Sequence, residues 1–272
     1  MKDKIMVFIP MYNCEKQIAR VLNQFHGEIE DYISQIIIIN NCSTDNGEET
    51  VKDYLSLRKD MRVPVTLLRN KSNYGLGGSH KVAFHYAMKH GYEYIIVLHG
   101  DDQGHIEDLL PYLKSGEYRK YDSFLGARFK KGAKLDGYSW FRTFGNILYN
   151  LLFSFVVHYI VYDLGSGLNL YRVDSLRSKF YEKYKDNLAF NYCMILGSSY
   201  YHQKIGFFPI HWSEEDQVSN VKMVNQAIVV LKILFSYFQN KRRFVEEEHR
   251  DKIVTEYKAE VIYIASGTGH EK

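Results

Sequence analysis

Two adjacent carboxylates follow an apolar run in the first half of the sequence. The run Tyr94–Leu98 leads directly into His99-Gly100-Asp101-Asp102-Gln103. A carboxylate at the end of a buried parallel strand lies at the edge of the sheet where ligands bind. Mg²⁺ and Mn²⁺ prefer oxygen ligands and often combine one or two carboxylates with substrate phosphates. The segment therefore predicts metal-assisted chemistry on a phosphorylated ligand; a helix cap made by Asp101 and Asp102 is the alternative.

Three more polar segments follow apolar runs. Asn73–Lys81 is rich in glycine and opens a helix, where backbone amides and the Lys81 ammonium suit a phosphate. Its spacing is not GxGxxG, so a dinucleotide site is not predicted, and an ordinary glycine-rich turn is the alternative. Asn40–Asp45 offers amides and hydroxyls to a base and ribose, or a cap to the next helix. Pro10–Glu15 likewise places polar groups at the start of a helix, after a strand that ends at a proline.

The elements that must position these segments alternate along the first half of the chain. Apolar runs predict five strands, at Ile5–Ile9, Ile36–Ile39, Val63–Leu68, Tyr94–Leu98 and Asp122–Ala127. Helical spacing predicts helices over Glu15–His26, near Glu48–Arg58 and from the glycine-rich loop to His90. A later helix over Leu188–Gln203 and a strand at Ile205–Ile210 complete the pattern. Strand and helix in alternation predict a mainly parallel sheet flanked by helices, with the polar segments together at one edge.

Composition limits the class of protein. With 272 residues, 46% hydrophobic and 25% charged, the chain is globular and can bury one sizeable core. The net charge of +3 is too small to indicate a nucleic-acid partner. Three scattered cysteines without metal-site spacing predict reduced thiols in a reducing compartment. We expect a domain over residues 1–218, divided near residue 127 into a donor and an acceptor side, and a helix with a charged tail over 219–272.

In this order the segments resemble family 2 of the GT-A glycosyltransferases, most closely the branch of dolichyl- and polyprenyl-phosphate sugar synthases. The resemblance covers about residues 4 to 215. The family motifs are matched by Pro10, Tyr12, Asn13 and Glu15; by Asn40, Asn41, Ser43 and Asp45; by Asn73, Gly75 and Gly77; by His99, Gly100, Asp101 and Gln103; and by Asp163, Gly167 and Tyr171. The resemblance implies a Rossmann-like α/β fold for a nucleotide-diphospho-sugar transferase. The motif residues from Pro10 to Gln103, together with Lys81 and Asp102, form the nucleotide-sugar site that the resemblance implies.

The resemblance also implies a divalent metal, Mn²⁺ or Mg²⁺, bound directly by Asp101, the last acid of the metal motif. Three positions depart from the family pattern, since His99, Asn40 and Asn41 stand where the family has acids. His99 can donate to phosphate or ribose, or bind metal as a neutral imidazole. Asn40 and Asn41 can still read a base through amide donors and acceptors. We therefore expect activity to persist.

On the acceptor side, the resemblance implies that Arg128 and Arg142 grip an acceptor phosphate, with Asn146 and Asn169 beside them. Guanidinium forks match phosphate oxygens, and ordinary surface arginines are the alternative. A lipid phosphate is already anionic and needs no general base, whereas a sugar hydroxyl needs one. Asp163 is the first candidate for a positioning group or base. The second is the acidic run Glu214, Glu215 and Asp216, for which a solvated loop is the alternative.

Two segments are apolar but too short to span a bilayer. Gly145–Tyr162 carries no formal charge and resembles the branch's interfacial helix, and Val221–Phe238 precedes the basic Lys241-Arg242-Arg243. Both predict helices lying on anionic lipid, with core packing or a dimer seam as the alternative. We expect a cytoplasmic protein, peripheral at the inner face of the membrane. Homo-oligomerisation stays open.

Three hypotheses for function follow. The first is transfer of a sugar from a nucleotide-sugar donor to a polyprenyl phosphate or lipid-linked glycan, in cell-surface polysaccharide synthesis. The second is the same fold acting on a soluble or growing glycan. The third is a nucleotide-sugar-binding protein that has lost catalysis, which the three replaced acids would explain.

Overall fold

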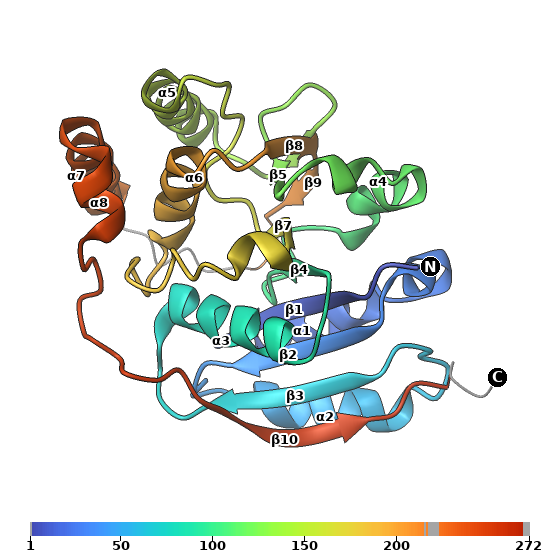
Figure 1. Ribbon diagram of the computed structural model, residues 1–272. Coiled ribbons are helices and arrows are strands. Elements are labelled where there is room, and N and C mark those ends of the chain that lie inside the picture. The colour runs from blue at the N-terminus through green and yellow to red at the C-terminus, as the bar shows by residue number, and fades with distance from the viewer. Residues whose placement is uncertain (1, 215, 217–222, 269–272) are drawn as a thin grey trace.

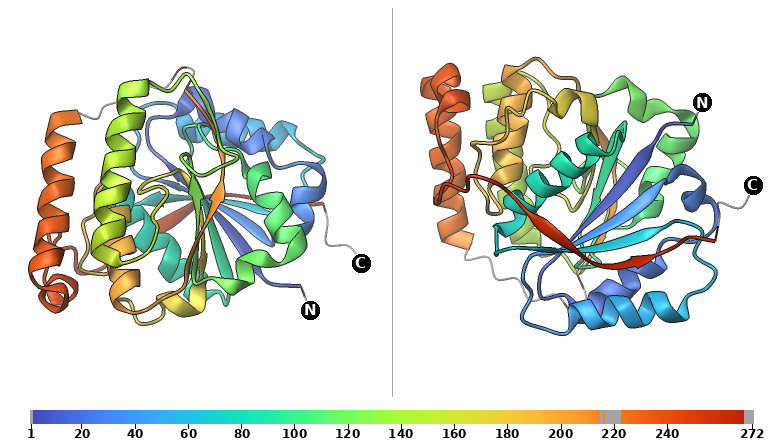
Figure 2. Two further views of the ribbon diagram at one scale, coloured as in Figure 1. Left: turned by 90° about the horizontal axis from the view of Figure 1, so that it is seen from above. Right: turned by 60° about the horizontal axis from the view of Figure 1, so that its bottom comes forward.

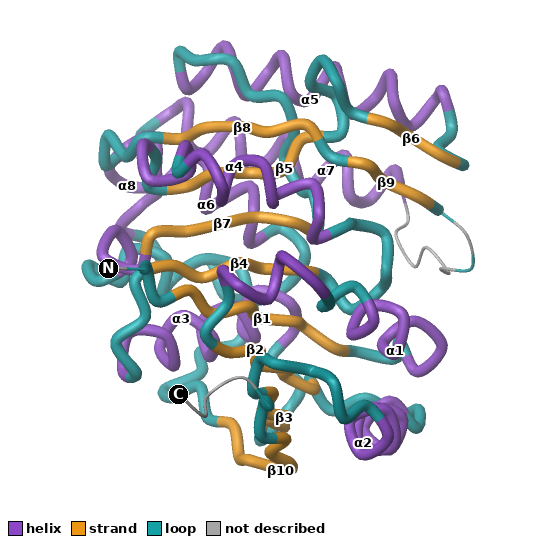
Figure 3. The backbone as a smooth tube through the Cα atoms, turned by 90° about the vertical axis from the view of Figure 1, so that its right-hand side faces the viewer, coloured by secondary structure: helices purple, strands orange, loops and turns teal. Residues whose placement is uncertain are grey.

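A single eight-stranded sheet organises the computed structural model, which describes residues 2–214, 216 and 223–268 (Figure 1). The strand order is β10-β3-β2-β1-β4-β7-β5-β8, and Figure 3 shows these strands following one another across the molecule. The strands are β1 Ile5–Met11, β2 Gln35–Asn40, β3 Val65–Asn70, β4 Tyr94–Leu98, β5 Ser123–Ala127, β7 Leu168–Arg172, β8 Ile205–Pro209 and β10 Ala259–Ala265. A second, two-stranded sheet pairs β6 Lys134–Asp136 with β9 His211–Ser213.

Strand direction brings the polar segments to one edge, as predicted. Strands β3, β2, β1 and β4 pair in parallel, so their carboxyl ends lie together. The run Ile36–Ile39 is fully buried, which is typical of a parallel strand covered on both faces. Two strands run antiparallel to their neighbours: β7, a short strand expected after Asp163–Asn169, lies between β4 and β5, and β10, which was not predicted, pairs with β3 at the edge of the sheet.

Helices cover both faces of the sheet, and Figure 2 shows the two layers. They are α1 Glu15–Asn23, α2 Gly47–Leu57, α3 Gly75–Lys89, α4 Leu110–Ser115, α5 Trp140–Val157, α6 Phe190–Tyr200, α7 Met223–Gln239 and α8 Lys241–Glu246. One apolar core lies under α3, α5, α6 and α7, and the other under α1, α2 and α4. Within the described residues, no helix has the length and apolarity needed to cross a bilayer. The mainly parallel α/β sheet predicted from the sequence is confirmed.

The last part of the chain differs from the expected charged tail. After α7 and α8 the backbone runs back past α3 and adds β10 antiparallel to β3, as Figure 1 shows. The strand Ala259–Ala265 is only partly buried, with Val261 and Ile264 exposed, and its pairing with β3 shifts register between Val261 and Tyr263. The basic residues Lys241–Arg243 lie in α8. The C-terminal segment therefore adds the outermost strand of the sheet, next to β3.

Candidate active site

The loops after β1, β2 and β4 are joined by backbone hydrogen bonds. Asn41 N donates to Met11 O (2.9 Å), and Gly100 N donates to Pro10 O (3.2 Å). A Cβ atom at residue 100 would lie 2.8 Å from Pro10 O, so glycine at this position permits the close approach. Three of the predicted polar segments therefore meet at one edge of the sheet.

The β1 and β2 loops also exchange side-chain contacts. Asn13 N donates to Ser43 Oγ (3.0 Å), and Asn13 Oδ1 accepts from Thr44 N (2.8 Å). Asp45 Oδ2 accepts from Glu15 N (2.8 Å) at the start of α1, where a carboxylate stabilises the free amides of a helix terminus. Glu15 and Asp45 therefore act as structural groups, and the capping alternative holds for Asp45.

Asn41 joins the β2 loop to the β3 loop. Its Nδ2 donates to Asn73 Oδ1 (2.8 Å), and its Oδ1 accepts from Tyr74 N (2.8 Å). Asn73 Oδ1 also accepts from Gly75 N (3.0 Å), so backbone amides fix the orientation of both side-chain amides. A carboxylate at residue 41 would face the Asn73 oxygen without a proton to share. An amide at residue 41 therefore fits the contacts made in this structure.

Asn40 is buried and fully engaged within the protein. Its Oδ1 accepts from Ser43 N (2.8 Å), and its Nδ2 donates to Glu48 Oε1 (2.6 Å). Hydrogen bonds from Arg69 hold the pKa of the Glu48 carboxyl below its usual value. An aspartate at residue 40 would place a second carboxylate against Glu48. Both ends of its amide therefore hold the loop, and the role of Asn40 in reading a base stays a prediction.

The two carboxylates after β4 have different surroundings. Asp102 accepts from Arg20 Nε (2.6 Å) and Gln24 Nε2 (2.9 Å), so it ties the β4 loop to α1. Asp101 is partly buried, and its Oδ1 accepts a long hydrogen bond from Gln103 N (3.4 Å). Desolvation raises the pKa of Asp101 to about 6, although Gln103 N and the charge of Arg128 oppose this shift. A desolvated carboxylate at the end of β4 suits a bound cation.

The donor set fits a metal that is only partly held by protein. Among the residues that the structure describes, no group of three or more His, Cys, Asp or Glu side chains could hold an ion. A single carboxylate completed by phosphate oxygens and waters is a common arrangement for Mg²⁺. Asp101 therefore fits as the one protein carboxylate of such a site.

His99 lies beside Asp101 with its ring against Gly167. A Cβ atom at residue 167 would lie 3.0 Å from His99 Cγ, and His99 N donates to Gly167 O (2.9 Å). Burial lowers the pKa of His99 to about 4, so the imidazole is neutral near pH 7. Its Nε2 is buried and has no hydrogen-bond partner within the described part of the chain. A neutral ring at this position avoids a second buried negative charge next to Asp101.

Arg128 and Asp163 form a buried, bidentate ion pair beside these groups. Arg128 Nε and Nη2 each donate to an Asp163 oxygen (2.8 Å), and Arg128 N adds a third hydrogen bond (2.9 Å). The guanidinium also stacks on the Trp212 ring at 5.0 Å. Arg128 is therefore not an ordinary surface arginine. With both oxygens occupied by Arg128, Asp163 is placed to position the arginine, which favours the positioning role over the alternative of a general base.

Tyr138 gathers the other acceptor-side residues. Arg142 stacks on its ring at 4.4 Å and pairs with Glu214 (2.6 Å), while Asn146 Nδ2 donates to the Tyr138 hydroxyl (2.9 Å). Arg128 Nη1 lies 3.5 Å from the same hydroxyl. Sequence reasoning missed Tyr138, whose only signal is an aromatic residue shortly before the apolar α5.

Two further candidates lie elsewhere. Asn169 is buried in β7 and donates to Ser166 O (3.0 Å), so its expected place on the acceptor surface is corrected. Asp216 pairs with Arg20 (2.9 Å) on the outside of α1. Glu215 lies outside the described residues.

The glycine-rich segment does not form a phosphate cradle. Gly77 N donates to Asp186 O (2.7 Å), and a Cβ atom at Gly75 would lie 2.4 Å from the same oxygen. Lys81 is completely buried and donates to Asp186 Oδ1 (2.7 Å) and Tyr184 O (2.7 Å). These glycines admit a protein backbone instead of a ligand, and the phosphate-binding expectation for Lys81 is corrected.

Comparison with known proteins places these features in a family. A family model described as Glycosyl transferase family 2 matches residues 6–180. A curated relative, polyprenol monophosphomannose synthase of Mycolicibacterium smegmatis, is 23% identical over 174 residues, which are 64% of this chain and 63% of the relative. The match thus spans less than two thirds of that protein.

Solved structures share the fold at low identity. TarS 1–349 of S. aureus in complex with UDP-GlcNAc has a TM-score of 0.58 at 17% identity, covering 87% of this chain and 67% of that one. The mannosyltransferase PcManGT of Pyrobaculum calidifontis, in complex with GDP-Man and Mn²⁺, has a TM-score of 0.54 at 13% identity, covering 89% and 64%. These likenesses establish the GT-A fold.

Proposed function

This chain belongs to Glycosyl transferase family 2, and from that premise we propose that it moves a sugar from a nucleotide-sugar donor to a lipid-linked phosphate. The observation that carries the proposal is the position of Asp101, a desolvated carboxylate next to the hydrogen-bonded β1 and β2 loops. The reaction is a displacement at the anomeric carbon. An acceptor oxygen forms a new bond to this carbon. The bond between the carbon and the donor's diphosphate oxygen breaks, and the nucleoside diphosphate leaves with its electron pair.

On the donor side, Asp101 would hold a divalent cation together with the donor's phosphate oxygens. Such an ion neutralises the charge that develops on the departing diphosphate. The PcManGT complex with GDP-Man and Mn²⁺ supports this for a protein of the same fold. Tyr12 is half exposed at the turn after β1 and offers a ring to the donor's base, while the Asn41–Asn73 contact holds the neighbouring loops in place.

On the acceptor side, Arg128, Arg142 and Asn146 would bind a phosphate around Tyr138. A phosphate oxygen attacks as an anion, so no proton acceptor is required. This agrees with an Asp163 whose oxygens are already occupied by Arg128. The name of the relative from Mycolicibacterium smegmatis, polyprenol monophosphomannose synthase, supports a lipid phosphate as the acceptor class.

The outer face of α5 and α7 would lie on the membrane. The two helices lie side by side at one end of the molecule, as Figures 1 and 2 show. Large apolar side chains are exposed along both: Trp140, Phe141, Phe144, Leu151 and Phe155 on α5, and Ile228, Leu231, Phe235 and Phe238 on α7. Phe155 is 72% exposed and Phe235 61%. Exposed apolar side chains on two adjacent helices, followed by the basic residues of α8, suit an anionic lipid surface.

A thermal-shift screen of UDP-, GDP-, CDP- and ADP-linked sugars, each with and without Mn²⁺, tests the donor half of the proposal. We expect one base class to raise Tm by about 5–10 °C at 100 times its Kd, and only with Mn²⁺. No shift with any donor contradicts the proposal. Binding without transfer to any acceptor favours the inactive binding protein instead.

Flotation with anionic vesicles tests the membrane half. Replacing Phe144 and Phe155 together by glutamate should reduce the vesicle-bound fraction at least about 10-fold. Two aromatic side chains would no longer insert into the lipid, and two charges would face it. Leu57→Glu is the matched control, since Leu57 is 81% exposed on α2, away from this face. Equal flotation of all three proteins, or none by the wild type, favours a soluble or growing glycan as acceptor.

A further inference from the structure

A segment near the C-terminus lies across the loop that precedes α6. We name residues 247–258, between α8 and β10, the C-terminal strap. His249 N in the strap donates to Lys183 O (2.8 Å), and Asp251 pairs with Lys185. Figure 1 shows the strap running from α7 and α8 to the β3 edge of the sheet. The strap is therefore fixed to the chain before α6 at more than one point.

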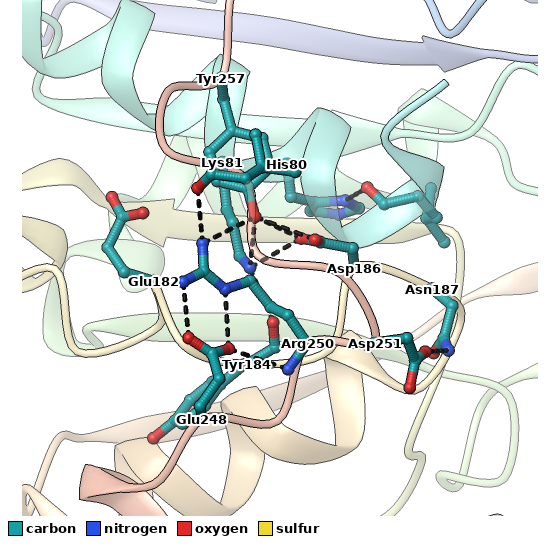
Figure 4. A network of polar contacts seen from close by, with 12 residues as sticks. His80, Lys81, Glu182, Tyr184, Asp186, Asn187, Glu248, Arg250, Asp251 and Tyr257 are labelled. Carbon is teal, nitrogen blue, oxygen red and sulfur yellow. Dashed lines mark hydrogen bonds and ion pairs between the residues drawn. The ribbon is translucent and has the colours of Figure 1, made fainter. Parts of the chain in front are cut away.

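Asp186 is the centre of the contact network drawn in Figure 4. Its carboxylate accepts from Lys81 Nζ (2.7 Å) and from the Tyr257 hydroxyl of the strap (2.8 and 2.9 Å). Its backbone oxygen accepts from Gly77 N (2.7 Å) and Gly78 N (3.2 Å) in the first turn of α3. One residue thus connects the strap to the N-terminus of α3.

The strap also contacts the loop that leads into α3. Lys258 N donates to the Tyr74 hydroxyl (3.3 Å), and the Tyr257 ring meets the Tyr74 ring edge-on at 5.3 Å. Tyr74 N in turn donates to Asn41 Oδ1, and Asn41 holds Asn73. Every step from the strap to the β2 and β3 loops is therefore a direct contact.

The network is buried and charged, so it has one favoured arrangement. The Lys81 side chain is completely buried, and burial lowers its pKa while Asp186 opposes the shift. Arg250 lies 3.4 Å from the Tyr257 hydroxyl and is itself paired with Glu248 (2.6 Å). Fully paired polar networks rigidify the segments they join, because a partly broken network leaves desolvated charge. Displacing Tyr257 would therefore loosen the turn that begins α3.

We propose that Asp186 and Tyr257 are positioning residues for the nucleotide-sugar donor, through which the C-terminal strap holds the Asn73–Tyr74 loop against the β2 loop of the donor site. The inference rests on the proposed function and deepens it. Asp186 and Tyr257 both lie beyond the residues 6–180 that the family model matches. A loop ordered in advance binds its ligand more tightly, because less conformational entropy is lost on binding.

Steady-state kinetics of Tyr257→Phe and Asp186→Asn test this inference. Each variant keeps the shape of the side chain. Tyr257→Phe removes the hydroxyl's hydrogen bonds with Asp186, Lys81 and Arg250, and Asp186→Asn removes the charge. We expect the donor KM, and the Kd of the matching nucleoside diphosphate, to rise about 10-fold. The acceptor KM and the kcat at saturating donor should stay within twofold of wild type, because neither residue touches the acceptor side.

Tyr181→Phe is the matched control. Tyr181 is also fully buried, but its hydroxyl has no hydrogen-bond partner among the described residues, so its donor KM should equal that of the wild type. An unchanged donor KM and Kd in folded Tyr257→Phe overturns the inference, as does a fall in kcat alone. If Asp186→Asn does not fold, Tyr257→Phe decides. A wild-type chain that binds no nucleoside diphosphate contradicts the proposed function, and with it this inference.

Discussion

Asp101→Asn should lower kcat for sugar transfer by at least about 10³-fold while the protein stays folded. The replacement keeps the side chain's shape but removes the carboxylate that would bind the cation at the departing diphosphate. Loss of one group that stabilises developing charge costs roughly 3–4 kcal/mol in comparable sites, which corresponds to this factor. Because desolvation already raises the pKa of Asp101 to about 6, the neutral amide should not destabilise the fold.

Asp174→Asn is the control for this experiment. Asp174 carries an exposed carboxylate that pairs with Arg177 on the surface, and its replacement should leave kcat unchanged. Initial rates with saturating donor and Mn²⁺ measure both variants. If Asp101→Asn retains a tenth or more of the wild-type kcat, the role assigned to this carboxylate is wrong.

Asp163→Asn should be the most destabilising of the substitutions considered. Asp163 is buried, and its two oxygens accept all three hydrogen bonds described above for Arg128. Removing one partner of a buried pair leaves the other charge uncompensated and costs about 3–5 kcal/mol in free energy of unfolding. For a chain of this size, that is a fall in Tm of about 10 °C.

The double variant Arg128→Met/Asp163→Leu separates stability from binding. It removes both charges and fills the space with apolar atoms, so it should recover most of the lost stability. It should not recover sugar transfer, because the guanidinium that would grip the acceptor phosphate is gone. Denaturation midpoints and initial rates measure the two effects. A single Asp163→Asn variant within 1 kcal/mol of wild type, or a double variant with normal transfer, contradicts this description of the pair.

The sheet was largely predictable, because its central strands are short apolar runs bounded by polar segments. The runs at Ile36–Ile39 and Tyr94–Leu98 became the buried strands β2 and β4 on either side of β1, and their carboxyl ends lie at the same edge of the sheet. The direction of β7 and the existence of β10 were not predictable in the same way. Period and hydrophobicity identify a strand but do not say which neighbour it joins or in which direction. Ala259–Ala265 is also half exposed at an edge, so its pattern is weak.

The site was predictable only where residue type and strand position suffice. Asp101 follows directly from its place at the end of β4. The environment of the Lys81 side chain could not be predicted in this way. A residue in the second turn of α3 can face the donor edge or the interior, and its partner Asp186 is 105 residues away. Asn40 and Asn41 looked like departures from an acidic motif, and their reason appears only with Glu48 and Asn73 in place. Long-range hydrogen bonds of this kind leave no local pattern.

The position of a bound metal tests the central claim most directly. Crystals grown with Mn²⁺ and the nucleoside diphosphate selected by the screen would give the ion's position from its anomalous scattering. The account predicts one Mn²⁺ within about 2.2 Å of an Asp101 oxygen, bridging to the diphosphate beside Gly100. An ion bound by other side chains, or a diphosphate bound away from the β1 and β4 loops, would contradict it.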